Sequence, residues 1–70
     1  MKRRFLISAK DFPPQEVECE GCSGDALMLA LQNKEVRHWK VNRRSPSGQD
    51  WFFDVALSED TKEFRVQTLC

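Results

Sequence analysis

Residues Glu16–Asn33, EVECEGCSGDALMLALQN, decide the fold of this 70-residue chain, because they join a half-buried strand directly to a compact apolar helix. In the first part, glutamates alternate with small apolar residues, and this two-residue period places the two kinds of side chain on opposite faces of a strand. In the second part, Ala26–Leu31 is continuously apolar and has high helix propensity, and Ser23 and Asp25 suit a helix N-terminus. The stretch predicts a strand over Glu16–Gly21 and a helix over Ser23–Asn33.

Further strands are predicted on both sides of this stretch by alternating apolar residues. Their expected ranges are Arg4–Lys10, Glu35–Arg44, Asp50–Leu57 and Lys62–Leu69. Phe12–Gln15 contains two prolines, which cannot donate ladder hydrogen bonds, and is expected to be a loop. Ser45–Gly48 and Ser58–Thr61 are expected turns. The predicted fold is α+β, in two layers: a single domain over residues 1–70, with one antiparallel sheet of four to five strands packed on one helix in the order β-β-α-β-β-β.

The alternation also predicts which residues face the helix. The expected core is Phe5, Ile7, Val17, Cys19, Leu27, Ala30, Leu31, Trp39, Val41, Phe53, Val55 and Phe64. On strand Glu35–Arg44, the residues Arg37, Trp39, Val41 and Arg43 are expected to share a face. The other face of the sheet is expected to be open and to carry Leu6, Phe52 and the charged side chains. Met28 and Leu29 would suit a homodimer contact if they are exposed.

Composition argues for a small folded binding domain in a reducing compartment. The formal net charge is zero, so no global field draws the chain to nucleic acid or membrane. Three cysteines are an odd number, which does not fit a secreted disulfide framework. The N-terminus begins like a signal peptide, but its apolar run is too short, and no segment approaches transmembrane length. A cytoplasmic location is therefore expected.

One cysteine pair raises the question of a metal site. Cys19 and Cys22 form a C-x-x-C motif, and with His38 and Cys70 they would supply three thiolates and an imidazole for tetrahedral zinc. The sequence contains no second close pair of ligands, and Cys19 lies on the inward face of its strand, so a buried free cysteine is the simpler interpretation. A redox pair is less favoured still. The sequence predicts no resident cofactor, with a small zinc-stabilised module kept as an alternative.

No residue pattern indicates an enzyme. His38 is the only histidine, and no triad partner or glycine-rich phosphate loop accompanies it. A chain of this size rarely encloses an active-site pocket. The protein is predicted to act without catalysis.

Basic residues cluster in two of the predicted strands. Lys34, Arg37, Lys40, Arg43 and Arg44 surround Trp39, and Lys2, Arg3, Arg4 and Lys10 lie near the N-terminus. Basic residues interleaved with an aromatic ring can bind phosphates and stack bases, so nucleic-acid binding through these strands is one hypothesis. The charge sign also alternates from one predicted strand to the next, so cross-strand ion pairing is the other interpretation.

The aromatic run Trp51, Phe52 and Phe53 points to an interaction surface. Successive side chains on a strand alternate, so at least one of these large rings must face solvent, a sheet edge or a partner. Trp, Phe and Arg are enriched at protein interfaces. The expected partner-binding residues are Arg37, Lys40, Arg43, Arg44, Trp51 and Phe52.

The strand-to-helix junction VECEGCSGDALMLALQN and the charged strands after it give the chain a layout that resembles small α+β anti-CRISPR proteins of phages, including an inhibitor of the type I-F surveillance complex. The resemblance covers most of the chain as topology and transfers no functional residue. It implies a stoichiometric inhibitor that occludes a surface of a larger protein or nucleoprotein complex in the host cytoplasm.

Overall fold

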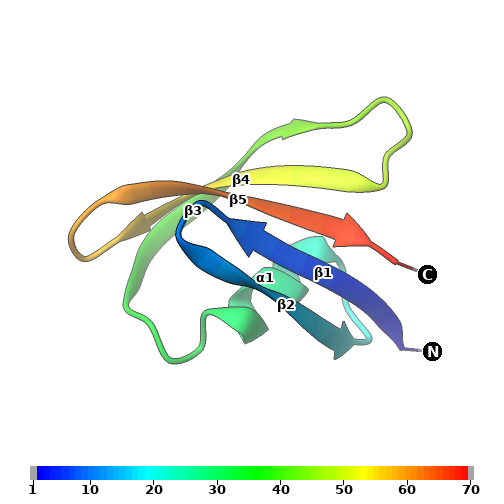
Figure 1. Ribbon diagram of the computed structural model, residues 1–70, viewed down its shortest axis with the longest axis horizontal. Helices are drawn as coiled ribbons and strands as arrows, with labels where there is room; N and C mark the ends of the chain where they lie inside the picture. The colour runs from blue at the N-terminus through cyan, green and yellow to red at the C-terminus, as the bar shows by residue number, and fades with distance from the viewer. Residues whose placement is uncertain (1, 70) are drawn as a thin grey trace.

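The computed structural model describes residues 2–69 as one antiparallel sheet with a single helix on one face (Figure 1). The elements are β1 (Arg3–Ala9), β2 (Phe12–Cys19), α1 (Ser23–Ala30), β3 (Val36–Arg44), β4 (Asp50–Leu57) and β5 (Thr61–Thr68). The strand order is β2-β1-β5-β4-β3. The β1–β2 hairpin therefore joins the β3–β4–β5 meander through the pairing of β1 with β5. The predicted α+β fold is confirmed.

The first hairpin is tighter than predicted. β2 begins at Phe12, so the predicted loop over Phe12–Gln15 is wrong and both prolines lie inside the strand. β2 is an edge strand, where a residue without an N–H group is tolerated. The turn that precedes it places Asp11 at a positive φ of 62°. The sequence reveals the prolines but does not reveal which strand lies at an edge.

The helix is shorter than predicted because it ends at Ala30 rather than at Asn33. At its start, Cys22 is the N-cap residue, and its backbone N–H donates to Asp25 Oδ2 at 3.0 Å in a capping-box arrangement. At its end, the Lys34 N–H donates to the Leu31 carbonyl at 2.9 Å, which closes the chain into a turn. The tight turn replaces the last predicted helical residues and leads directly to β3.

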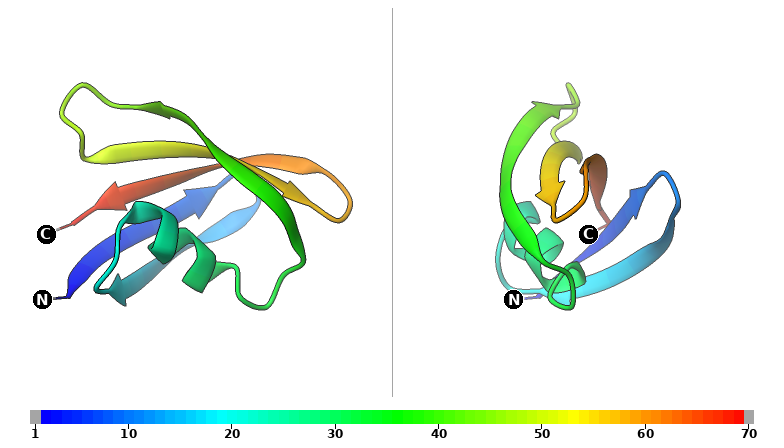
Figure 2. Two further views of the ribbon diagram at one scale, coloured as in Figure 1. Left: turned by 180° about the vertical axis from the view of Figure 1, so that it is seen from behind. Right: turned by 90° about the vertical axis from the view of Figure 1, so that its left-hand side faces the viewer.

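The hydrophobic core lies between α1 and one part of the curved sheet (Figure 2). The helix packs mainly on β2, β5 and β1. The buried apolar residues are Phe5, Ile7, Cys19, Ala26, Leu27, Leu31, Phe53, Val55, Phe64 and Val66. Val17 and Ala30 are half-buried against this core. Ala26 and Val66 were not in the expected core, and both are fully buried.

Two residues of β3 that were predicted to be core residues are not buried. Trp39 is 40% exposed and Val41 is 48% exposed. Both occupy the helix side of the sheet, where Trp39 pairs with Val55 and Val41 pairs with Phe53. The prediction is wrong because the short helix meets β3 only beside Trp39, near Gly24, and leaves most of the strand uncovered.

A substitution at Gly21 tests the contribution of the Asp25 cap at the start of α1. A Cβ atom at this position would collide with the Asp25 carboxyl group that caps α1. We expect Gly21→Ala to lower the free energy of unfolding by about 1 to 2 kcal/mol, the usual cost of losing a helix cap. Chemical denaturation measures this loss. The same substitution on an Asp25→Ala background should cost far less, and an equal cost in both backgrounds would contradict the proposed clash.

Candidate functional site

The strand β3 differs from the rest of the sheet in exposure and in charge. It is an edge strand that pairs with β4 alone, and every residue from Arg37 to Arg44 is exposed. The strand carries Arg37, Lys40, Arg43 and Arg44, and it contains no acidic residue. We use the name β3 surface for β3 together with Trp51 and Phe52 of the neighbouring strand β4.

Two bulges change the direction of the side chains along β3. The register shifts between Val36 and His38 and again between Val41 and Arg43, so Arg37 and Asn42 are the extra residues. Asn42 Nδ2 donates to Glu63 Oε2 of β5 at 2.9 Å, which holds the second bulge on the open face of the sheet. The bulges overturn the prediction that Arg37, Trp39, Val41 and Arg43 share one face.

The second bulge decides which face of the sheet each of the two consecutive arginines occupies. Arg43 pairs with Phe52 on the open face, and its Cζ atom lies 4.0 Å from the centroid of the Phe52 ring. Arg44 pairs with Trp51 on the helix side, with its Cζ atom 5.5 Å from the Trp51 ring centroid. Exposed cation–π contacts of this kind contribute about 0.5 to 1 kcal/mol. The predicted residues Arg43, Arg44, Trp51 and Phe52 are therefore brought together as two arginine–aromatic pairs.

The β3 cations form no salt bridge among the described residues, although Lys40 lies opposite Asp54 in the ladder with β4. Salt bridges join Lys2 to Glu18, Arg4 to Glu16 and Arg65 to Asp50. Across residues 2–69, none of the four β3 cations has a carboxylate at salt-bridge distance. Cross-strand ion pairing is thus present between β1 and β2 but not between β3 and its neighbour.

An apolar strip accompanies these cations on the helix side. Trp39, Val41 and Trp51 occupy neighbouring positions of β3 and β4 on this face. The Trp39 ring meets Phe53 edge-to-face at a centroid distance of 5.5 Å. It also lies so close to Gly24 that a Cβ atom there would be 2.9 Å from the ring. The strip is therefore anchored at the start of α1 while much of its surface stays exposed.

The structure does not bring together two other groups of residues that the sequence suggested, the possible zinc ligands and the basic strands β1 and β3. Cys19 is buried on the helix side of the β2 edge, whereas His38 pairs with Ala56 on the open face of the β3 edge. Cys70 lies outside the described residues, and within them no three His, Cys, Asp or Glu side chains converge as metal ligands. The basic strands β1 and β3 are separated by β5 and β4, so they do not form one continuous surface.

The two residues suggested for a homodimer contact differ in exposure. Leu29 is 44% exposed, whereas Met28 is half-buried against the core. Only one of the two residues is therefore available for a contact between two copies of the chain.

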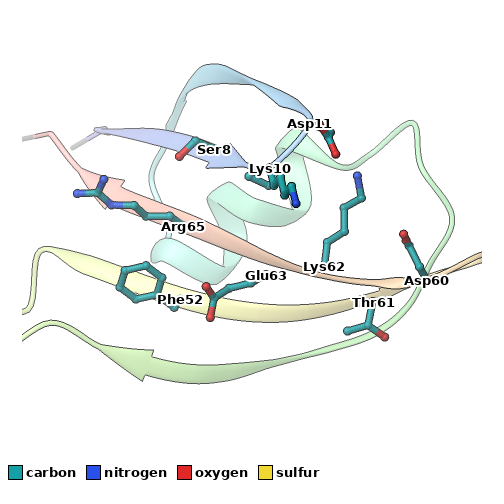
Figure 3. Close-up of a pocket in the computed structure, with 10 residues that line it drawn as sticks. Ser8, Lys10, Asp11, Phe52, Asp60, Thr61, Lys62, Glu63 and Arg65 are labelled. Atoms are coloured by element: carbon teal, nitrogen blue, oxygen red, sulfur yellow. The ribbon is translucent and has the colours of Figure 1, made fainter.

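Sequence reasoning missed a hollow on the open face, between the β1–β2 turn and the β4–β5 turn (Figure 3). Its volume is about 570 Å³, and it is lined by Ser8, Ala9, Lys10, Asp11, Phe52, Asp60, Thr61, Lys62, Glu63 and Arg65. The lining mixes both charge signs. In the part of the chain that the structure describes, no buried side-chain polar atom lacks a hydrogen-bond partner. The hollow therefore contains no buried, unpartnered polar side-chain atom that a ligand would satisfy.

Comparison with known proteins gives no family assignment. Family models, curated proteins and solved structures were all searched, and none matches this chain. Between residues 2 and 69, no helix is long and apolar enough to cross a membrane.

The β3 surface should be dispensable for folding. We expect Arg43→Ala and Arg44→Ala each to lower the free energy of unfolding by no more than about 1 kcal/mol, because each removes one exposed cation–π contact. Phe53→Ala, which empties a buried site on the same strand pair, should cost about 3 to 5 kcal/mol. Urea denaturation followed by circular dichroism compares the variants. A large loss of stability from either arginine substitution would show that its cation–π pair has a structural role.

Proposed function

We propose that this protein is a small non-enzymatic binding protein that occludes a surface of a larger protein or nucleoprotein complex. The observation that carries the proposal is the β3 surface, with four cations that no carboxylate of residues 2–69 neutralises and two arginine–aromatic pairs at the same end of the strand. The four cations are exposed, and Trp51 and Phe52 are half-buried beside them. A binding surface would account for this combination.

The composition of the β3 surface supports a protein partner. Arg, Trp and Phe are enriched at protein interfaces, and Trp and Arg dominate the residues that lose most affinity on truncation. The stacked guanidinium groups are already positioned, so less side-chain entropy is lost on binding. The contact residues are Lys40, Arg43, Arg44, Trp51 and Phe52. Arg37, in the first bulge, would contact the partner at the far end of the strand.

The proposed mode of action is stoichiometric, because a binding surface acts by covering its target. The resemblance of the expected layout to phage anti-CRISPR proteins favours a host-defence complex in the cytoplasm as that target.

Nucleic-acid binding is the second candidate. The un-neutralised cations of β3 and the exposed ring of Trp39 favour it, because backbone phosphates and stacked bases require these two features. It differs from the first candidate in its dependence on salt, since each neutralised phosphate releases counterions. Binding to a protein through a few side chains would fall less steeply with salt.

Affinity capture with charge-reversed variants tests the proposed function. The wild-type protein should retain a defined protein complex from host lysate after nuclease treatment. The Arg43→Glu/Arg44→Glu variant should lose that complex, because reversed charges repel the acidic surface that the β3 cations select. Quantitative mass spectrometry of nuclease-treated and untreated samples measures the retention.

The control is Arg3→Glu/Lys10→Glu, which makes the same change in net charge at exposed positions away from β3. This variant should retain the complex. Equal retention by both double variants would remove the β3 surface from the binding site. Recovery of nucleic acid with scattered basic proteins, all lost on nuclease treatment, would favour the second candidate.

A further inference from the structure

We propose that β3 receives its partner by strand addition, with an extended acidic segment of the partner protein pairing with the free edge of this strand. The inference rests on the proposed function, because it specifies how the β3 surface binds and what chemistry it selects. Three properties of the described residues support it: an unpaired backbone edge, side chains of different character on the two faces, and a charge that opposes pairing with a second copy of the chain.

The first property is the unpaired edge. β3 is hydrogen-bonded to β4 on one side, and no loop or turn of the described chain donates a backbone bond to its other side. An edge strand presents a row of N–H and C=O groups that can template another strand. The bulges at Arg37 and Asn42 leave a regular run over residues 38–41. The ladder formed with a partner would therefore be short and centred on this run.

The second property is the difference between the two faces of this run. His38 and Lys40 face the open side, where Arg43 follows beyond the bulge. Trp39 and Val41 face the helix side and are 40% and 48% exposed. Because side chains alternate along an added strand, a complementary segment would alternate acidic residues with apolar residues. The acidic residues would meet Lys40 and Arg43, and the apolar residues would extend the strip of Trp39 and Val41.

The third property is the charge, which opposes pairing between two β3 strands. Each of the two strands would carry four cations and no acidic residue, and like charges brought close together destabilise a sheet. The other sheet edge is no better a partner. β2 carries Pro13 and Pro14, which have no N–H to donate, and its Glu16 and Glu18 are already paired with Arg4 and Lys2. The occupant of the β3 edge is therefore an acidic segment of another protein.

The experiment uses the full chain and a soluble probe peptide of alternating glutamate and valine, capped at both termini. Titration followed by NMR measures the affinity, and amide hydrogen exchange reports on individual residues. Strand addition predicts that alternate amides of residues 38–41 become protected, because only every second N–H of a strand faces its edge. The matched probe has the same side chains and N-methylated amides. It should bind at least roughly tenfold more weakly, because it cannot donate backbone hydrogen bonds.

A charge swap tests the selectivity. Lys40→Glu should reduce the preference of the protein for the glutamate–valine peptide over a lysine–valine peptide, and Lys10→Glu, in the distant β1–β2 turn, should leave the preference unchanged. An unchanged preference of Lys40→Glu would overturn the assigned chemistry.

The remaining outcomes separate this inference from the proposed function. Equal affinity for the two glutamate–valine probes, protection without alternation, or no binding of either probe would overturn strand addition. If Arg43→Glu/Arg44→Glu still abolished capture of a protein complex, the β3 surface would bind through side chains alone. Binding of an oligothymidine strand at β3 in place of the peptide, with a steep salt dependence, would overturn both proposals in favour of nucleic acid.

Discussion

The feature on which the rest of this structure depends is the size of the single helix among residues 2–69. α1 has eight residues, so it is about 12 Å long and roughly 10 Å across. Five strands spaced by about 4.8 Å form a sheet about 19 Å wide. The helix covers β2, β1 and β5 and packs little on the other two strands (Figure 2). The Trp39 side chain nevertheless lies close to Gly24. The exposure of β3 follows from this difference in size.

The two edges of the sheet are protected in different ways. β2 has two prolines and glutamates that pair with cations of β1. β3 has two bulges and four cations without acidic partners among the described residues. Both arrangements discourage pairing between copies of the chain. Only the β3 edge retains cations without salt bridges among the described residues, and these cations lie beside aromatic rings. A strand that repels its own copies remains open to an acidic partner.

Residue periodicity predicted the elements of this fold but not the relations between them. Asp50–Leu57 forms a strand with the bounds that its alternation predicts, and the apolar run Ala26–Leu31 lies in or directly after the helix. Pro13 and Pro14 were misinterpreted because tolerance of proline depends on strand order, which local sequence does not encode. Trp39 and Val41 alternate as core residues do, and only the extent of the helix decides that they stay exposed.

The candidate site was predicted in composition and not in geometry. Arg43, Arg44, Trp51 and Phe52 were expected to bind a partner, and the structure brings them together. The face that each arginine occupies depends on the bulge at Asn42, where no glycine or proline marks an irregularity. The hollow beside Phe52 combines residues from β1, β4 and β5, so no contiguous sequence motif indicates it.

The most direct test of the account is hydrogen–deuterium exchange of the protein, alone and in complex with its captured partner. The account predicts that protection on binding is concentrated in β3 and in residues 45–52, which contain the β3–β4 turn and the paired rings Trp51 and Phe52. The β1–β2 turn should exchange as it does in the free protein. Protection concentrated there, with β3 unchanged, would contradict the assignment of β3 as the binding surface.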